Sequence, residues 1–455
     1  MRVRYGIRGG AVGILAVFLL FLLIGPAGAQ ENGGGTVQVT LEECIEKGLS
    51  SSPLIDQAEA GVVKQRAQLE VTGRNRWPSL ELTGGLSYLS EVEGEFVIPP
   101  APPISLTSGG GESVSLEVSA VQPLFTGFEI ESGIDIGRQL LRQARLEQEH
   151  SVREVQYRIE QAYWNLVYAV ESVKVVYKSV EQSESLLQQV DSLFNQGMAT
   201  REEVLRMEMN LEQALLRKLE SEHALQLAMM QLNQLTGYEA DQVTVPSCDF
   251  DGSAAGSVGL EYEVILAEAL ARRSELQMLE IQMGIQEIER RKAVAGWLPN
   301  ISLQGQVQYA KPNPRQFPPE DQFVLSWQIG VMGSINFSEL KTTGPELSRI
   351  EGTRREIESR RESLIQNISL RIKQDLLDIE KSRQSLEASE TILAQAGENY
   401  DIVYDKFRSG SAVDSDLITA QQQLLEAQLR RTRALTAQRQ ALSRLRYDVG
   451  DGGVR

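Results

Sequence analysis

The sequence predicts a mainly helical protein with a smaller membrane β part, built from two copies of one helix–strand–strand–long helix hairpin unit. Three observations support this fold class. The chain repeats itself, it holds very long segments with helical periodicity, and it has four short segments in which apolar and polar residues alternate. Each feature recurs at the same place in both halves, which indicates a duplicated structural unit larger than an ordinary solenoid repeat.

The duplication is visible as a gapless alignment of residues 41–90 with residues 262–311, at an offset of 221 (262 − 41 = 221). Farther along, Gly197 aligns with Gly410, at an offset of 213 (410 − 197 = 213). A shorter loop in the second half accounts for the change of offset. The two halves therefore predict the same order of helices and strands.

The first 29 residues have the character of an export signal. Arginines at the start precede an apolar run over residues 11–24, and Ala27, Gly28 and Ala29 supply the small residues that a signal peptidase requires. The apolar run is short for a membrane-spanning helix. We predict that residues 1–29 are removed on export; the alternative is a retained N-terminal anchor.

The composition excludes several functions. The formal net charge of −17 becomes −20 once the three signal arginines are removed (−17 − 3 = −20), and such an acidic chain repels nucleic acid. The sequence contains no nucleophile–base pair, no metal-ligand spacing and no phosphate-binding loop, so we expect no catalytic, cofactor or metal residues and no enzyme activity. Cys44 and Cys248 have no metal spacing, and pairing between them stays open.

The elements follow in the same order in both halves. The first repeat, 30–237, is expected to contain helices over 41–76, strands 79–90 and 113–124, and long helices 127–195 and 200–236. A linker over 238–260 leads to the second repeat, 261–450, and residues 451–455 form a tail. The second repeat is expected to contain helices over 262–296, strands 300–311 and 323–336, and long helices 346–408 and 413–449.

The long helices are predicted from apolar residues that recur every three or four positions with no proline between them. A helix of 65 residues is about 100 Å long, which exceeds any globular core, so these helices must pack on one another along their length. Short turns at Gly197 and Gly410 reverse the chain, since glycine provides the left-handed residue that ends a helix.

The strands are predicted from strict alternation. Their apolar faces include Leu82, Leu116, Leu303 and Leu325, and their polar faces include Glu81, Glu117 and Gln304. This pattern is typical of a transmembrane β-barrel, although a half-buried soluble strand alternates in the same way. Loops rich in proline or glycine, residues 91–112 and 312–322, join the strands of each pair. Four strands do not close a barrel, so several copies of the chain must share one.

Several segments resemble the TolC family of outer-membrane efflux and type I secretion ducts. Gln122–Phe125 resembles the family's strand-to-helix exit, residues 161–166 its first tube helix, and residues 232–237 the end of its returning helix. The resemblance covers about residues 39–450. It implies a homotrimer with a 12-stranded outer-membrane barrel in outer-membrane lipid, four strands per protomer, continuous with an α-helical barrel across the periplasm. It also implies a periplasmic adaptor (membrane fusion protein) and an inner-membrane pump as partners.

The resemblance also implies a periplasmic entrance lined by acidic residues, six positions beyond each turn glycine. Those positions are Glu203 and Asp416, with Asp414 close by. Rings of such acids would favour cations; alternatively, they complement the dipoles of helix N-termini. In the best-known member of the family, a tyrosine and an arginine lock the closed tips. Phe407 and Ala412 stand at the matching positions here, so the lock would need a substitute such as Arg201, Arg206 or Arg408.

The predicted function is the exit duct of a tripartite efflux or type I secretion system, a passive channel for small molecules or polypeptides. The alternative is a periplasmic coiled-coil adaptor or structural scaffold of the cell envelope, which requires the long helices but not four amphipathic strands. Ducts for drugs, metals and proteins share this architecture, and no methionine or histidine cluster indicates metals.

Overall fold

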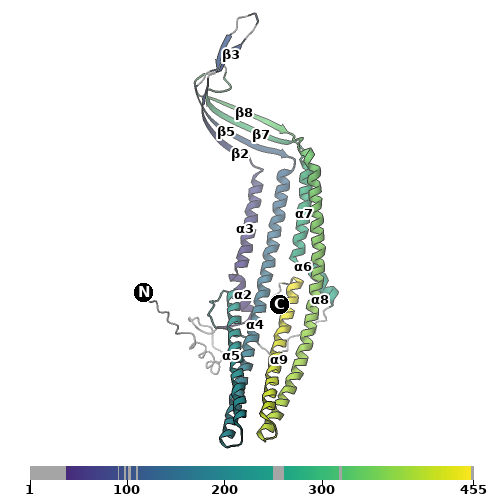
Figure 1. Ribbon diagram of the computed structural model, residues 1–455. Helices are drawn as coiled ribbons and strands as arrows, with labels where there is room; N and C mark the ends of the chain where they lie inside the picture. The colour runs from purple at the N-terminus through teal and green to yellow at the C-terminus, as the bar shows by residue number, and fades with distance from the viewer. Residues whose placement is uncertain are drawn as a thin grey trace, which may run out of the picture.

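The computed structural model describes residues 37–90, 92–96, 99–100, 104–108, 111–248, 261–316 and 320–451. The predicted signal segment, residues 1–29, lies outside them. The protein is elongated, with a sheet at one end and two helix turns at the other (Figure 1). Its order is β1, α2, α3, β2, β3, β4, β5, α4, α5, β6, α6, α7, β7, β8, α8 and α9.

Two helices run the whole distance from the sheet to the turns. They are α4 (Glu129–Asn195, 67 residues) and α8 (Glu339–Arg408, 70 residues), each about 100 Å long at 1.5 Å per residue. The returning helices α5 (Arg201–Thr236) and α9 (Asp414–Val449) cover only the half nearest the turns. Within the described residues, no helix combines the length and the apolar character needed to cross a membrane.

The half nearest the sheet is covered by shorter helices. The helices expected over 41–76 are α2 (Leu41–Ser51) and α3 (Pro53–Arg74). Ser52 is extended because a proline follows it, and proline disfavours a helical conformation in the preceding residue. The helices expected over 262–296 are likewise α6 (Tyr262–Arg272) and α7 (Ser274–Ala295), separated by an extended Arg273.

Helix α8 begins earlier than the expected residue 346. Pro345 lies inside the helix, in its second turn. A proline at this position removes the single backbone hydrogen bond to the carbonyl group of Lys341, and the helix continues past it.

The central sheet has the order β2-β5-β7-β8 and is antiparallel throughout. Its strands are β2 (Ser79–Leu89), β5 (Gly111–Thr126), β7 (Asn300–Lys311) and β8 (Val324–Ser334). The pairing of β5 with β7 joins the two repeats. A register shift between Pro123 and Phe125 marks the bulge where β5 approaches α4.

The strand register places most of the apolar residues of the four strands on one face. One cross-strand row is Leu82, Val118, Val307 and Trp327, and the adjacent polar row is Glu81, Ser119, Gln306 and Gln328. Residues opposite one another in an antiparallel pair share a face, so the predicted two-faced sheet is confirmed. Most of the apolar side chains on β2 and β8 are exposed in the single chain.

Two further pairings were not expected. The loop over 91–112 contains a hairpin of β3 (Val92–Phe96) and β4 (Ile104–Ser108), which projects beyond the sheet (Figure 1). The linker over 238–260 contains β6 (Thr244–Pro246), which pairs in parallel with β1 (Val37–Val39). This small sheet ties the start of the first repeat to the segment that follows α5.

Three apolar clusters stabilise the helices. One lies where α2 and α5 pack on α4, around Ile159, Tyr163 and Leu232. Its counterpart lies where α6 and α9 pack on α8, around Ile368, Ile372 and Leu445. A third joins all four long helices close to the turns. The helix tips are therefore packed as one unit within the chain.

Candidate functional site at the helix tips

The two helix turns lie together at the end of the molecule farthest from the sheet (Figure 1). Gly197 and Gly410 have φ angles of 75° and 72°, as predicted for glycines that end helices. The amide of Met198 donates to the carbonyl of Leu193 at 2.9 Å, and the amide of Ser411 donates to that of Lys406 at 2.8 Å. Both turns are thus Schellman motifs, which end one helix and allow the chain to change direction within a few residues.

An apolar cluster next to the turns, on the side toward the sheet, fixes the four helix ends relative to one another. It contains Leu186 and Val190 of α4, Val204 and Met207 of α5, and Leu417 of α9, with Phe407 of α8 packed against it. Leu417 and Val204 are fully buried. Residues that flank these positions are consequently held at defined places on the surface of the tips.

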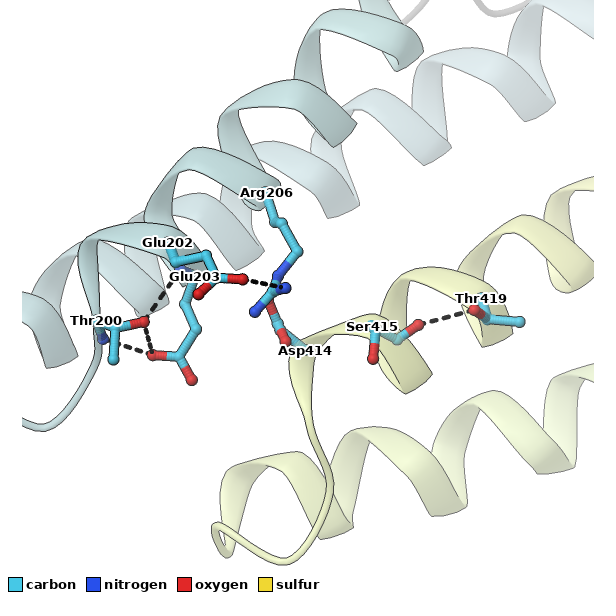
Figure 2. Close-up of polar contacts among 7 residues, drawn as sticks. All are labelled: Thr200, Glu202, Glu203, Arg206, Asp414, Ser415 and Thr419. Carbon is cyan, nitrogen blue, oxygen red and sulfur yellow. Dashed lines mark hydrogen bonds and ion pairs between the residues drawn. The ribbon is translucent and has the colours of Figure 1, made fainter.

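Glu203 forms a capping box at the start of α5. Its Oε2 accepts hydrogen bonds from the backbone amide of Thr200 at 2.5 Å and from the Thr200 hydroxyl at 3.0 Å, while its own amide donates to the Thr200 hydroxyl at 3.3 Å (Figure 2). These bonds satisfy the free amides of the helix N-terminus and place a negative charge at the positive end of its dipole. Glu203 therefore serves the helix cap, the alternative role considered for it.

Asp414 links the two repeats. Its Oδ2 accepts a hydrogen bond from Nε of Arg206 at 2.7 Å, and Arg206 also pairs with Glu202 at 2.9 Å (Figure 2). Asp414 is only 4% exposed. The hydrogen bond to Asp414 raises the pKa of Arg206, so this guanidinium stays charged. The charge of Asp414 is thereby compensated inside the chain, and α5 is tied to α9 across the seam between the repeats.

Asp416 is the acidic residue that faces solvent. It lies in the first turn of α9 beside the buried Leu417, and its side chain is exposed. Its amide bonds to the carbonyl of Val413 at 3.1 Å. Within the described part of the chain, its carboxylate has no ion-pair partner. Glu203 and Asp416 are equivalent in the repeat (416 − 203 = 213), yet only Glu203 takes part in a side-chain cap of its helix.

A buried polar layer above the tips was missed by the sequence analysis. Asn210 of α5 donates to Gln421 of α9 at 3.1 Å and to Ser183 of α4 at 3.2 Å, and Gln421 donates to Ser183 at 2.9 Å. The signal for it was present, because Asn210 and Gln421 fall on the apolar stripes of their helices. Such a layer, fully bonded, specifies one register of the three helices.

The cysteines do not contribute to the tips. Cys44 is buried and Cys248 is exposed, and both are free thiols. Burial raises the pKa of Cys44 to about 12, so this thiol stays protonated and unreactive. Among the described residues, no group of three or more His, Cys, Asp or Glu side chains is arranged to hold a metal ion.

Comparison with known proteins assigns the chain to a family. The model of the outer membrane efflux protein family matches residues 44–238 and 265–450 of this chain. A search of curated proteins gave no match.

Solved structures of outer-membrane channels share the fold. CusC, studied for its folding and transmembrane channel formation, is 16% identical, with a TM-score of 0.76 over 93% of this chain and 95% of its own. The CmeC outer membrane channel of Campylobacter jejuni is 14% identical, with a TM-score of 0.75 over 90% and 86% of the two chains. VceC of Vibrio cholerae is 15% identical, with a TM-score of 0.71 over 90% and 96%.

Proposed function

The chain belongs to the outer membrane efflux protein family and is an outer-membrane exit duct, and from this premise we propose that it works as a passive homotrimer. In this proposal, the trimer carries small molecules or polypeptides from a periplasmic entrance at the helix tips to the cell exterior. It works with a periplasmic adaptor and an inner-membrane pump, which supply the energy and the cargo. The matches favour this function over an adaptor or scaffold, and the relatives are channels rather than enzymes.

The observation that carries the proposal is the four-stranded sheet with two unpaired edges. Within the described residues, β2 and β8 each pair on one side only. A sheet edge cannot face lipid, because its backbone N–H and C=O groups would lose their hydrogen bonds. Pairing of β8 from one copy with β2 from the next satisfies both edges. Three copies then form a barrel of twelve strands (3 × 4 = 12).

The apolar face of the sheet supports a membrane position for this barrel. Leu82 and Trp327 are 67% and 69% exposed in the single chain. Apolar side chains in contiguous rows on one face call for an apolar environment. In the proposal, lipid covers this face, and the polar row that includes Gln306 faces the water-filled interior.

Two helices carry apolar residues that the single chain leaves exposed, and these suit contact with neighbouring copies. On α5 they are Leu205, Met209, Leu216, Leu219 and Leu227, and on α8 they are Leu370, Leu377, Ile392 and Ile402. In the chain, α5 packs on α4 and α8 packs on α9, while α4 contacts α9. Helices α5 and α8 are thus the outer helices of the set. Packing of α5 against α8 of the next copy would close a helical barrel below the sheet.

The tip acids then have different tasks. Three copies of Asp416 would line the periplasmic entrance and favour cations there. Glu203 caps α5, and Asp414 holds α9 against Arg206 of α5. In this proposal the Arg206–Asp414 pair takes the place of the tip lock found in the best-known member. The entrance charge is carried mainly by one acidic residue per protomer.

The assembly is tested by the native mass of the detergent-solubilised protein, together with its fractionation. We expect three copies per particle, recovered with the outer membrane. A stable monomer, or a protein released from the envelope without detergent, would refute the proposal. Ion conductance of the trimer in a planar bilayer then tests whether the assembled particle is open to solutes.

A further inference from the structure

Two buried carboxyl groups meet where α8 packs on α9, far along these helices from the tips. Asp375 of α8 is 3% exposed and Asp448, in the last turn of α9, is 6% exposed. Both carboxyl groups line the same groove, and a hydrogen bond with Asp448 is one cause of the raised pKa of Asp375. A hydrogen bond between two carboxyl groups requires a proton on one of them, because an ionised carboxylate only accepts.

Asp448 is the member that is paired with cations. Its Oδ1 accepts a hydrogen bond from Nη2 of Arg273 at 2.9 Å, and Nη1 of Arg371 lies 3.9 Å from the same oxygen. Arg273 is itself 4% exposed and occupies the break between α6 and α7. Its extended backbone ends α6 and sets the guanidinium against α9. Two cations therefore stabilise the negative form of Asp448.

Asp375 has no such partner. Its Oδ2 is buried and has no hydrogen-bond donor among the described residues. The carboxyl lines a groove of about 540 Å³, together with Arg371 and Asp378 of α8, Arg444 and Tyr447 of α9, and Tyr157 of α4.

A second arginine of this groove is engaged elsewhere. Arg444 pairs with Asp378 at 3.4 Å, and its hydrogen bond with Tyr157 raises its own pKa. The positive charge of Arg444 therefore compensates the charge of Asp375 only in part. The groups that face Asp375 thus leave one buried carboxyl without a compensating charge, and a proton is the smallest ligand that supplies one.

We propose that Asp375 is a proton-binding site, and that its proton, shared with Asp448, holds α8 against α9 and makes this seam sensitive to pH. When the proton is bound, Asp375 donates to Asp448 and the pair carries one negative charge, which Arg273 and Arg371 balance. When the proton leaves, two negative charges face each other in a buried seam, and their repulsion loosens the packing.

The energetics agree with this geometry. Burial, the charge of Asp448 and the hydrogen bond to it raise the pKa of Asp375 from 3.8 to about 7. The folded protein thus binds a proton that the unfolded chain has already lost above about pH 4. The stability of the seam therefore falls as pH rises from about 4 to about 7, and it changes no further from this source at higher pH.

Infrared spectroscopy tests the proton directly in the full-length detergent-solubilised protein. The wild type should show the absorption of a protonated carboxyl group that disappears with a midpoint of about pH 7. Asp375→Asn should lack this absorption, since the amide keeps a donor toward Asp448 without titrating. Asp401→Asn is the matched control: it lies on the same helix, far from the pair and exposed to solvent, and should keep the wild-type titration.

Thermal unfolding supplies the second measurement. The midpoint temperature of the wild type and of Asp401→Asn should fall between about pH 5 and about pH 7, whereas that of Asp375→Asn should stay nearly level. Above pH 7 the Asn variant should therefore be the more stable protein. Absence of a carboxyl group that titrates near pH 7 in the wild type would overturn the proposal, whether or not the variants fold. So would an Asp375→Asn variant that keeps the wild-type dependence on pH.

Discussion

A charge placed in the middle of the apolar sheet face should block assembly, whereas the same charge one residue away should not. Val307 belongs to the row of Leu82, Val118 and Trp327, and its neighbour Gln306 points to the opposite face. Because side chains alternate along a strand, Val307→Arg and Gln306→Arg differ by one residue in position but send their guanidinium groups to opposite faces of the sheet.

The size of the effect follows from the strand length. β7 has 12 residues, or about 40 Å at 3.3 Å per residue, and a tilt of about 45° makes it about 28 Å tall. This matches an apolar band of about 25 Å. Val307 lies seven residues past Asn300, which is about 16 Å up and thus near the midplane. An arginine there should cost about 2–4 kcal/mol per protomer. Leu303, four residues nearer to α7, lies closer to the boundary and should cost less.

The assay compares the amount of assembled trimer in the outer-membrane fraction for the two variants and the wild type. Val307→Arg should reduce it strongly, and Gln306→Arg should leave it near the wild-type level. Val307→Leu serves as the control for substitution at that position. Equal assembly of the two arginine variants would refute the assignment of the faces, and reversed results would mean that the apolar row faces inward.

Three further predictions concern the helix ends. Asp416→Asn should lower cation selectivity in planar-bilayer recordings and weaken block by divalent cations; unchanged selectivity would put the constriction elsewhere. Arg206→Ala leaves the buried Asp414 without its cation, so the tips should part more easily and single-channel conductance should rise, and wild-type conductance would argue against the lock. Gly237→Ala should destabilise more than Gly197→Ala in thermal unfolding. Both have positive φ, a strain of about 1–2 kcal/mol for alanine, but only at Gly237 would the new Cβ lie 2.7 Å from a serine hydroxyl oxygen. Equal decreases in the unfolding midpoint of the two variants would show that the positive φ angle alone sets the cost.

The sequence by itself determined the features that depend on neighbouring residues. Alternation of apolar and polar residues predicted which residues of each strand share a face, and the register of Val307 with Val118 agrees with it. Gly197 and Gly410 predicted where the long helices turn, because only glycine adopts positive φ without strain. The duplication predicted that the second half repeats the first. The alternation and the turn glycines are each complete within a few residues of chain, and the duplication is visible when one half of the sequence is compared with the other.

Only the tertiary structure decided the contacts between residues that are distant in sequence. Asp414 was one of three acids that looked alike, and its pairing with Arg206, 208 residues away, gives it a different role from Asp416. The partnership of Asp375 with Asp448 and the break at Arg273 left no local signal either. From the sequence, a polar residue on a long helix is predicted to be exposed to solvent, and only the packing of the helices shows whether it is buried. Its charge then depends on which groups the neighbouring helices bring to it, and the periodicity of one helix contains no information about that.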